Sequence, residues 1–184
     1  MNQTNYKIAL QSKIWITNAL FELMKSHDYS TITISQICRK SDLSRRTFYR
    51  HFTSKDEILS EKFLSLLEEF LTTLSHSEPI SFLDMSSAYF EFWHKNKELL
   101  KLLKTNQLLP RIFIQLQAQI PNICKNLQRT DTEICHSDAL FYANAFALGG
   151  LNNMLLTWID NDMNKTPSQL TNDLICFLNS ASRF

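Results

Sequence analysis

The chain has 184 residues, of which 44% are hydrophobic and 20% charged, and it contains only two Gly and four Pro. This hydrophobic fraction excludes a disordered chain, and the scarcity of Gly and Pro excludes collagen-like and low-complexity sequences. Turn-rich β architectures need glycine at positive φ, so two adjacent glycines cannot supply many such turns. We therefore expect an all-α fold.

The net charge of +1 conceals an asymmetry along the chain. Residues 1–62 carry ten Lys and Arg against six Asp and Glu, a net charge of +4. Residues 63–184 carry nine against twelve, a net charge of −3. A small basic module therefore precedes a larger acidic one, and we expect two domains with a boundary near residue 62.

Several features predict a cytoplasmic protein. The residues up to Lys13 contain no apolar run of the length that a secretory signal needs. Residues 139–159 carry no charge, but their asparagines, central glycine pair and acidic flanks make them a poor membrane span. Widely spaced cysteines within apolar helical patterns favour buried thiols in a reducing compartment, and the cysteines are Cys38, Cys124, Cys135 and Cys176.

Apolar periodicity and capping signals predict the helices of the basic module. Residues 8–26 read as an amphipathic helix whose apolar side holds Ile8, Ile14, Trp15, Ala19, Leu23 and Met24. Thr33 and Gln36 form a capping box that opens a short helix, and Ser44 is the N-cap of a second helix over residues 45–51. A box from Ser54 to Glu57 then opens a long helix that ends near Ser75.

The acidic module is predicted to be helical throughout. Its periodic segments span residues 81–104, 107–120, 122–129, 133–160 and 167–181. Pro110 is expected to mark a helix start and Pro121 a break. The last helix has a specific start signal, because Thr166 is an N-cap, Pro167 suits the first helical position and Gln169 closes a capping box.

Two short helices joined by a three-residue turn form the layout of a helix-turn-helix DNA reader. A basic face between Arg39 and Lys55 is, on charge alone, an ordinary solvated surface. Apolar residues at helical spacing add the core of a compact three-helix module, and they are Ile34, Ile37, Leu43, Phe48 and Phe52. The combined pattern favours DNA binding.

Each candidate DNA contact has a chemical reason. The start of a recognition helix enters the major groove, which places Ser44, Arg45, Arg46 and Thr47 at the base edges. An arginine can donate two parallel hydrogen bonds to guanine O6 and N7, so Arg45 and Arg46 are the expected base readers. Residues around them would bind phosphates, namely Tyr49, Arg50, His51 and Lys55, with Thr33 and Ser35 at the start of the preceding helix.

The segment 43–59, with residues 33–38 before it, closely resembles the DNA-binding module of the TetR family of bacterial repressors. The specific part reads Thr47-Phe48-Tyr49-Arg50-His51-Phe52-Thr53-Ser54-Lys55. Residues 146–151 and Trp158-Ile159 are similar to the penultimate helix of one subset of the family. Family members usually have glycine in the turn and before the second helix, where this chain has Asp42 and Asp28, and aspartate tolerates the left-handed backbone better than most residues.

The resemblance implies an all-helical homodimer that binds a near-palindromic operator, with residues 1–62 as the DNA-binding domain. The domain over residues 63–184 would hold a small-molecule effector and dimerise through the last two helices. Independently, a helix without charge on any face, such as 139–159, needs cover all round, and a second subunit would supply it. Candidate interface residues are Gly149, Gly150, Asn153, Trp158, Leu174 and Phe177. The glycine pair could permit close packing or mark a kink.

Aromatic residues of the acidic module could line an effector cavity, although such residues at helical spacing are more often plain core. The candidates are Phe82, Met85, Tyr89, Phe92, Trp93, Phe113, Phe141, Tyr142 and Phe146.

Two other function classes compete with a DNA-binding repressor. Residues 91–94 and 133–136 are Glu-x-x-His motifs, the spacing found in di-iron bundles, but no carboxylate lies between residues 99 and 130 to complete the site. We therefore expect no catalytic site, metal or cofactor. The other class is a TetR-like dimer that recruits a second protein instead of binding DNA.

Overall fold

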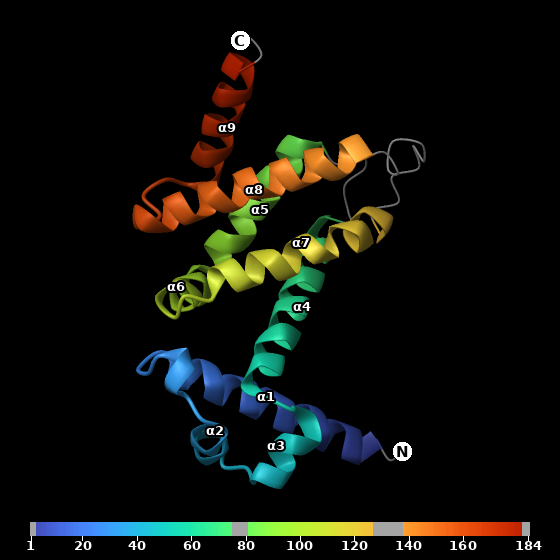
Figure 1. Ribbon diagram of the computed structural model, residues 1–184, viewed down its shortest axis with the longest axis vertical. Helices are drawn as coiled ribbons and strands as arrows, with labels where there is room; N and C mark the ends of the chain where they lie inside the picture. Colours follow the sequence, from blue (N-terminus) through green and yellow to red (C-terminus); the bar gives the residue numbers. More distant parts are fainter. Residues whose placement is uncertain (1–2, 75–80, 127–137, 182–184) are drawn as a thin grey trace. The chain divides into compact units, whose positions relative to one another are not determined.

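A computed structural model of the chain describes residues 3–74, 81–126 and 138–181 (Figure 1). Within these ranges the regular elements are helices and there is no strand, which confirms the predicted all-α fold. The chain divides into two compact units, Met1–Leu66 and Leu67–Phe184.

The first unit is a small helical module. It contains α1 (Gln3–Met24), a short 3-10 turn (Tyr29–Thr31), α2 (Ile34–Ser41), α3 (Arg45–His51) and the start of α4 (Lys55–Leu74). Helix α1 packs against both α2 and α3, and α2 packs against α3. The fully buried side chains at the centre include Ile16, Leu20, Ile37, Phe48, Phe52 and Ile58.

Helix α1 buries only part of the predicted apolar set, which includes the buried Ala19 and Met24. Ile8, Ile14 and Trp15 are 56%, 43% and 49% exposed, whereas Ser12 and Ile16 are buried. Apolar residues extend around more than one side of this helix, so periodicity alone does not determine which side meets α2 and α3. Ser12 tolerates burial because its hydroxyl donates to the Ile8 carbonyl at 3.0 Å.

The described residues of the second unit form five helices and the last part of α4. They are α5 (Phe82–Lys95), α6 (Lys97–Thr105), α7 (Leu109–Asn126), α8 (Asp138–Asp160) and α9 (Pro167–Ala181). Helix α5 packs against α9, and α7 packs against both α6 and α8. Its core is rich in aromatic rings, which include Phe70, Tyr89, Phe90, Phe92, Trp93 and Trp158.

Asn96 divides the predicted segment 81–104 into two helices. It has φ −98° and ψ 23°, and it both ends α5 and begins α6. Its side-chain amide donates to the Phe92 carbonyl at 3.0 Å, which satisfies a group at the end of α5. Asparagine competes with the helix in this way because its short amide reaches nearby backbone groups.

The two prolines of α7 behave differently from each other. Pro110 lies at the second position of the helix, where a backbone N–H has no intrahelical partner, so the predicted start is confirmed. The predicted break at Pro121 is wrong, since α7 continues to Asn126. An interior proline removes one backbone hydrogen bond, and the remaining bonds carry this helix past it.

The start of α9 is confirmed in detail. The Thr166 N–H donates to Gln169 Oε1 at 2.8 Å, and the Gln169 N–H donates back to Thr166 Oγ1 at 3.3 Å. Cys38 is buried as predicted, whereas Cys176 on α9 is exposed, so burial of every thiol was a wrong expectation. The side chains of Cys124 and Cys135 lie outside the described part of the chain.

Candidate nucleic-acid interface

A single left-handed residue closes the turn between α2 and α3. Asp42 has φ 55° and ψ 37°, and the Leu43 N–H donates to the Cys38 carbonyl at 3.0 Å. Glycine is the usual residue at this point of a helix ending, so the expectation that Asp42 adopts the left-handed backbone is confirmed. The same expectation for Asp28 is wrong, because its φ of −61° and ψ of 134° are extended backbone.

Helix α3 presents its first turn to solvent on a rigid base. Ser44 caps the helix, since its hydroxyl accepts from the Thr47 N–H at 3.0 Å and lies 3.0 Å from the Thr47 hydroxyl. Arg45 and Arg46 follow and are exposed. Phe48 is completely buried, which fixes the rotation of α3 against the core. Both predicted base readers therefore stand on the solvent side of a short, well-capped helix.

The end of α3 brings together charges from three helices. Arg50 Nη2 lies 3.5 Å from Nε2 of the half-buried His51. The Lys13 ammonium on α1 lies 2.8 Å from each carboxylate oxygen of Glu61 on α4. The same ammonium lies 5.2 Å from the centre of the Phe52 ring. Burial lowers the pKa of His51, and the positive charges of Arg50 and Lys13 lower it further against the opposing effect of Glu61.

At the start of α2 the predicted capping box is present. The Thr33 hydroxyl accepts from the Gln36 N–H at 3.3 Å, and Gln36 Oε1 accepts from the Thr33 backbone N–H at 2.7 Å. The Thr33 hydroxyl also donates to Gln36 Oε1 at 2.8 Å. The Thr33 side chain is therefore engaged in the helix cap, whereas Ser35 in the first turn of α2 is exposed.

Lys55 has a different role from the predicted phosphate contact. Its ammonium donates to the carbonyls of Tyr29, Ser30 and Ile32, at 2.6, 3.1 and 2.8 Å. It also lies 4.5 Å from the centre of the Tyr29 ring. An ammonium has three N–H groups, and all three are used here, so Lys55 fastens the segment before α2 to the first turn of α4.

The cap of α4 reaches one residue further back than predicted. The Glu57 N–H donates to the Ser54 hydroxyl at 3.2 Å, as a capping box requires. The Glu57 carboxylate, however, accepts from the backbone N–H and hydroxyl of Thr53, at 2.5 and 2.7 Å, and these bonds lower the pKa of Glu57. Ser54 therefore accepts the bond from the Glu57 N–H, but Thr53 and not Ser54 donates to the Glu57 carboxylate.

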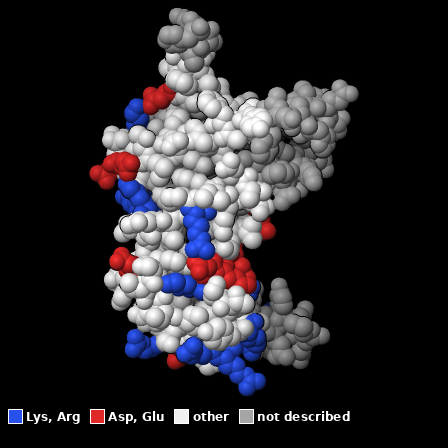
Figure 2. Space-filling view, in the orientation of Figure 1, with Lys and Arg blue, Asp and Glu red and all other residues white. Residues whose placement is uncertain are grey.

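Positive charge gathers on the side of the first unit that carries these helices. Figure 2 shows Lys and Arg side chains along the edge where Figure 1 places α2 and α3. The exposed basic residues of these two helices are Arg39, Lys40, Arg45, Arg46 and Arg50. Such a surface provides the electrostatic attraction on which DNA binding depends.

Comparison with known families decides the assignment. Residues 16–61 match the bacterial regulatory proteins of the tetR family, and residues 80–180 match the family described as transcriptional regulator C-terminal region. The chain belongs to the TetR family. Its two matched regions are the helix-turn-helix module and the C-terminal region of a transcriptional regulator.

Individual TetR relatives are distant. Over 169 residues, 85% of this chain, it is 28% identical to an uncharacterized HTH-type transcriptional regulator, YxbF, of Bacillus subtilis, and the match covers 41% of that protein. Over 111 residues, 60% of this chain, it is 27% identical to DhaS of Lactococcus lactis, named an activator of the dhaKLM operon, and covers 53% of it. The chain thus spans about half of each of these relatives.

A solved TetR regulator shares the fold. The crystal structure of a TetR transcriptional regulator from Streptococcus agalactiae superposes with a TM-score of 0.68, at 18% sequence identity. The alignment covers 95% of this chain and 97% of that one. The TetR fold therefore extends over both units of the chain, each of which has its counterpart in that structure.

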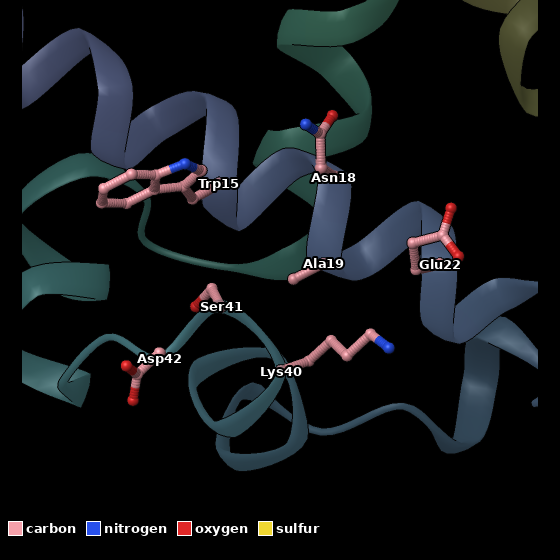
Figure 3. Close-up of a pocket in the computed structure, with 7 residues that line it drawn as sticks. All are labelled: Trp15, Asn18, Ala19, Glu22, Lys40, Ser41 and Asp42. Atoms are coloured by element: carbon pink, nitrogen blue, oxygen red, sulfur yellow. The ribbon is translucent and has the colours of Figure 1, made fainter.

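The TetR module of this chain also carries a surface groove of about 410 Å³ between α1 and the end of α2 (Figure 3). Its lining mixes an exposed aromatic ring with both signs of charge, and it consists of Trp15, Asn18, Ala19, Glu22, Lys40, Ser41 and Asp42. Glu22 also pairs with Lys25 at 2.5 Å. No local sequence pattern indicates this groove, because it forms between two helices.

The predicted effector residues do not form one group. Tyr89, Phe92 and Trp93 are buried together on α5, with Phe70 of α4 at 6.2 Å from Tyr89 and 5.4 Å from Phe92 between ring centres. Phe82, Met85 and Phe113 are half-buried, whereas Tyr142 and Phe146 on α8 are 69% and 78% exposed. The side chain of Phe141 lies outside the described residues.

The aromatic cluster contains one buried polar contact. The Tyr89 hydroxyl donates to Asn152 Oδ1 of α8 at 2.7 Å, and both side chains are almost fully buried. Burial raises the pKa of Tyr89 far above its usual range, so the phenol stays protonated and donates this bond. The contact joins α5 to the middle of α8.

The predicted dimer residues also separate into two groups. Trp158 is 2% exposed, its indole N–H donates to the Lys165 carbonyl at 3.0 Å, and its ring stacks on His94. Trp158 and the buried Leu174 therefore belong to the core of the protomer and are not available to a partner. By contrast Gly150, Asn153 and Phe177 are exposed, and no atom lies within 4 Å of a Cβ added at Gly149 or Gly150.

Groups of metal ligands and membrane-spanning helices do not occur among the described residues. Among the described residues, no three His, Cys, Asp or Glu side chains are grouped as metal ligands would be. Glu91 and His94 are exposed, and residues 133–136 lie outside the described ranges. None of the described helices is long and apolar enough to cross a bilayer.

The lowered pKa of His51 gives a testable pH dependence. Because His51 binds a proton less readily when folded, the free energy of unfolding should fall as the pH drops through about 6.5, the usual pKa of histidine. His51→Gln should flatten this dependence between about pH 7.5 and 5.5, measured by urea unfolding at each pH. The exposed His27→Gln is the matched control. Equal pH dependence in the wild type and His51→Gln would contradict the assignment.

Proposed function

We propose that this TetR-family chain is a sequence-specific repressor that binds a near-palindromic operator as a homodimer. The observation that carries the proposal is the first turn of α3, which is capped by Ser44, anchored by Phe48 and presents Arg45 and Arg46 to solvent. A recognition helix reads bases with its N-terminal residues, and a two-fold dimer would contact half-sites about 34–36 Å apart.

The distribution of charge supports DNA as the partner. The first unit holds the +4 of residues 1–62, and its exposed basic residues lie on α2 and α3. Binding that neutralises several phosphates releases counterions, so affinity should fall steeply with salt. A TetR-like dimer that only recruits another protein would need neither exposed base readers nor this basic surface.

The homodimer would form through the exposed residues of α8 and α9. Two large aromatic side chains on α8, Tyr142 and Phe146, stand in solvent together with Phe177 of α9. Large exposed apolar side chains that share an element are typical of an interface. The absence of side chains at Gly149 and Gly150 would let a second helix approach the backbone closely.

An effector bound in the second unit would relieve repression. The aromatic cluster around Tyr89 and Asn152 supports this role, because ligand sites combine apolar walls with a few placed polar groups. Activation is the second candidate function, because the relative DhaS is a named activator. Both functions need the same DNA reading, and a reporter gene behind the selected operator distinguishes them by the sign of its response.

Selection of bound fragments from random duplex DNA by the purified protein tests the proposal. We expect a near-palindromic site to be enriched. Failure to enrich any site would favour the protein-recruiting alternative, and a site without two-fold symmetry would contradict the homodimer.

Base reading by α3 predicts a specific pattern of losses. Arg45→Ala or Arg46→Ala should weaken binding to the selected operator about 5- to 100-fold, since a bidentate arginine–guanine pair contributes roughly 1–3 kcal/mol of discrimination. Binding to random duplex should fall much less, measured by fluorescence anisotropy at fixed salt. Lys97→Ala removes the same charge from α6 and is the control. Equal losses of affinity for the operator and for random duplex would mean that these arginines contact phosphates and not bases.

A further inference from the structure

We propose that Tyr49 is a positioning residue that holds the guanidinium of Arg45 in one orientation on α3 and thereby sets the base preference of Arg45. The proposal rests on the proposed function, in which α3 reads DNA. Tyr49 then contributes to sequence recognition through another side chain, in place of the phosphate contact expected from sequence.

The contact between the two side chains has two components. Arg45 Nη2 lies 3.5 Å from the Tyr49 hydroxyl oxygen, and the guanidinium carbon lies 6.0 Å from the centre of the Tyr49 ring. Residues four apart are neighbours on a helix surface, so the backbone of α3 brings the pair together. The hydrogen bond is long, and the attraction of the cation to the ring supplements it.

Tyr49 can orient Arg45 because its own ring is held. It meets Phe48 edge to face, with the ring centres 5.5 Å apart and the planes at 83°. Phe48 is completely buried, whereas Tyr49 is 49% exposed. A buried anchor therefore supports the tyrosine, and the tyrosine supports the arginine, on the outer side of α3.

The two candidate base readers differ in this respect. Arg45 is fixed by Tyr49, whereas the Arg46 side chain has no hydrogen-bond or ion-pair partner among the described residues. An arginine side chain without a partner loses rotamer entropy when it is ordered on DNA, and orienting it in advance removes part of that cost. The bond to Tyr49 uses one of five N–H groups, which leaves others for a base. Arg45 should therefore impose the sharper base preference.

The test compares base preferences at each position of the selected site. Selections are run with the full-length wild type, Arg45→Ala, Tyr49→Ala and Tyr49→Phe. Arg45→Ala identifies the base pair that Arg45 reads. Tyr49→Ala should relax the preference at that same pair and leave the others unchanged, with about a 5- to 10-fold loss on the operator and less than a 2-fold loss on random duplex. Tyr49→Phe keeps the ring but loses the hydroxyl, so the strength of its base preference should lie between those of the wild type and Tyr49→Ala.

A double variant separates positioning from an independent contact. If Tyr49 acts through Arg45, the variant Arg45→Ala/Tyr49→Ala should bind the operator as Arg45→Ala does. Additive losses, or equal losses of Tyr49→Ala on operator and random duplex with unchanged base preference, would overturn the proposal and make Tyr49 a phosphate contact. If the wild type enriches no site, the proposed DNA-binding function fails instead, and the two failures are distinguishable.

Discussion

Replacing Lys55 with methionine should lower the free energy of unfolding by about 2–4 kcal/mol. The ammonium donates to three carbonyls of the segment before α2, and hydrogen bonds to charged groups contribute about 1.5–3 kcal/mol each, without simple additivity. Methionine retains the length and apolar stem of the lysine, so the loss would arise from the ammonium. The carbonyls of Ser30 and Ile32 would lose this donor and would have to find water, whereas the Tyr29 carbonyl would keep the Ile32 N–H at 3.3 Å.

Urea unfolding followed by circular dichroism measures this loss. Lys62→Met is the matched control, because it removes the same charge seven residues later on α4. We expect the control to change the free energy of unfolding by no more than about 0.5 kcal/mol. If Lys55→Met unfolds like the control but binds DNA more weakly, the original prediction of a phosphate contact is right and the structural role of Lys55 is wrong.

Placing glutamate at Phe146 should convert the proposed dimer into monomers. Phe146 is 78% exposed in the protomer, so the change should leave the fold of one chain intact. In a dimer formed through α8, however, it would bury a carboxylate in an apolar interface, which costs several kcal/mol. A monomer contacts one half-site, and we expect operator affinity to fall at least about 100-fold, the equivalent of roughly 3 kcal/mol.

Sedimentation velocity at micromolar concentration and operator binding follow the two consequences of Phe146→Glu. Ile114 on α7 is 68% exposed, and Ile114→Glu is the control that places the same charge on another helix of the second unit. If the Phe146→Glu protein still sediments as a dimer, this part of α8 does not form the dimer interface.

Local signals in the sequence predicted the helix-turn-helix well. The caps at Thr33, Ser44 and Thr166 and the bounds 45–51 of the recognition helix are confirmed, because each depends on hydrogen bonds within a few residues. Asn96 and Pro121 show the weakness of the same approach. Whether an asparagine ends a helix or a proline breaks one depends on a balance between competing backbone hydrogen bonds, which the residue type alone does not decide.

Contacts between residues far apart in the sequence could not be predicted from these local signals. The partners of Lys55 lie 23 to 26 residues earlier, so no local pattern could show that its ammonium is already bound. The core position of Trp158 depends on Phe90 and His94, on another helix. The exposed Trp15 and the buried Ser12 likewise reflect which side of α1 the other helices cover. The base-reading and interface residues stay predictions.

Asp42 is one of several residues other than glycine that adopt the left-handed backbone in this protein. Among the described residues, positive φ occurs at Asp42, Gln107, Asp162 and Met163, and at neither glycine. A side chain in this region costs roughly 1–2 kcal/mol in the folded state. A residue with a side chain also has fewer conformations in the unfolded chain than glycine has, which lowers the entropy of the unfolded state. The strain at these helix endings is thus partly offset by the lower entropy of the unfolded ensemble, so glycine substitution there would stabilise the protein less than relief of strain alone suggests.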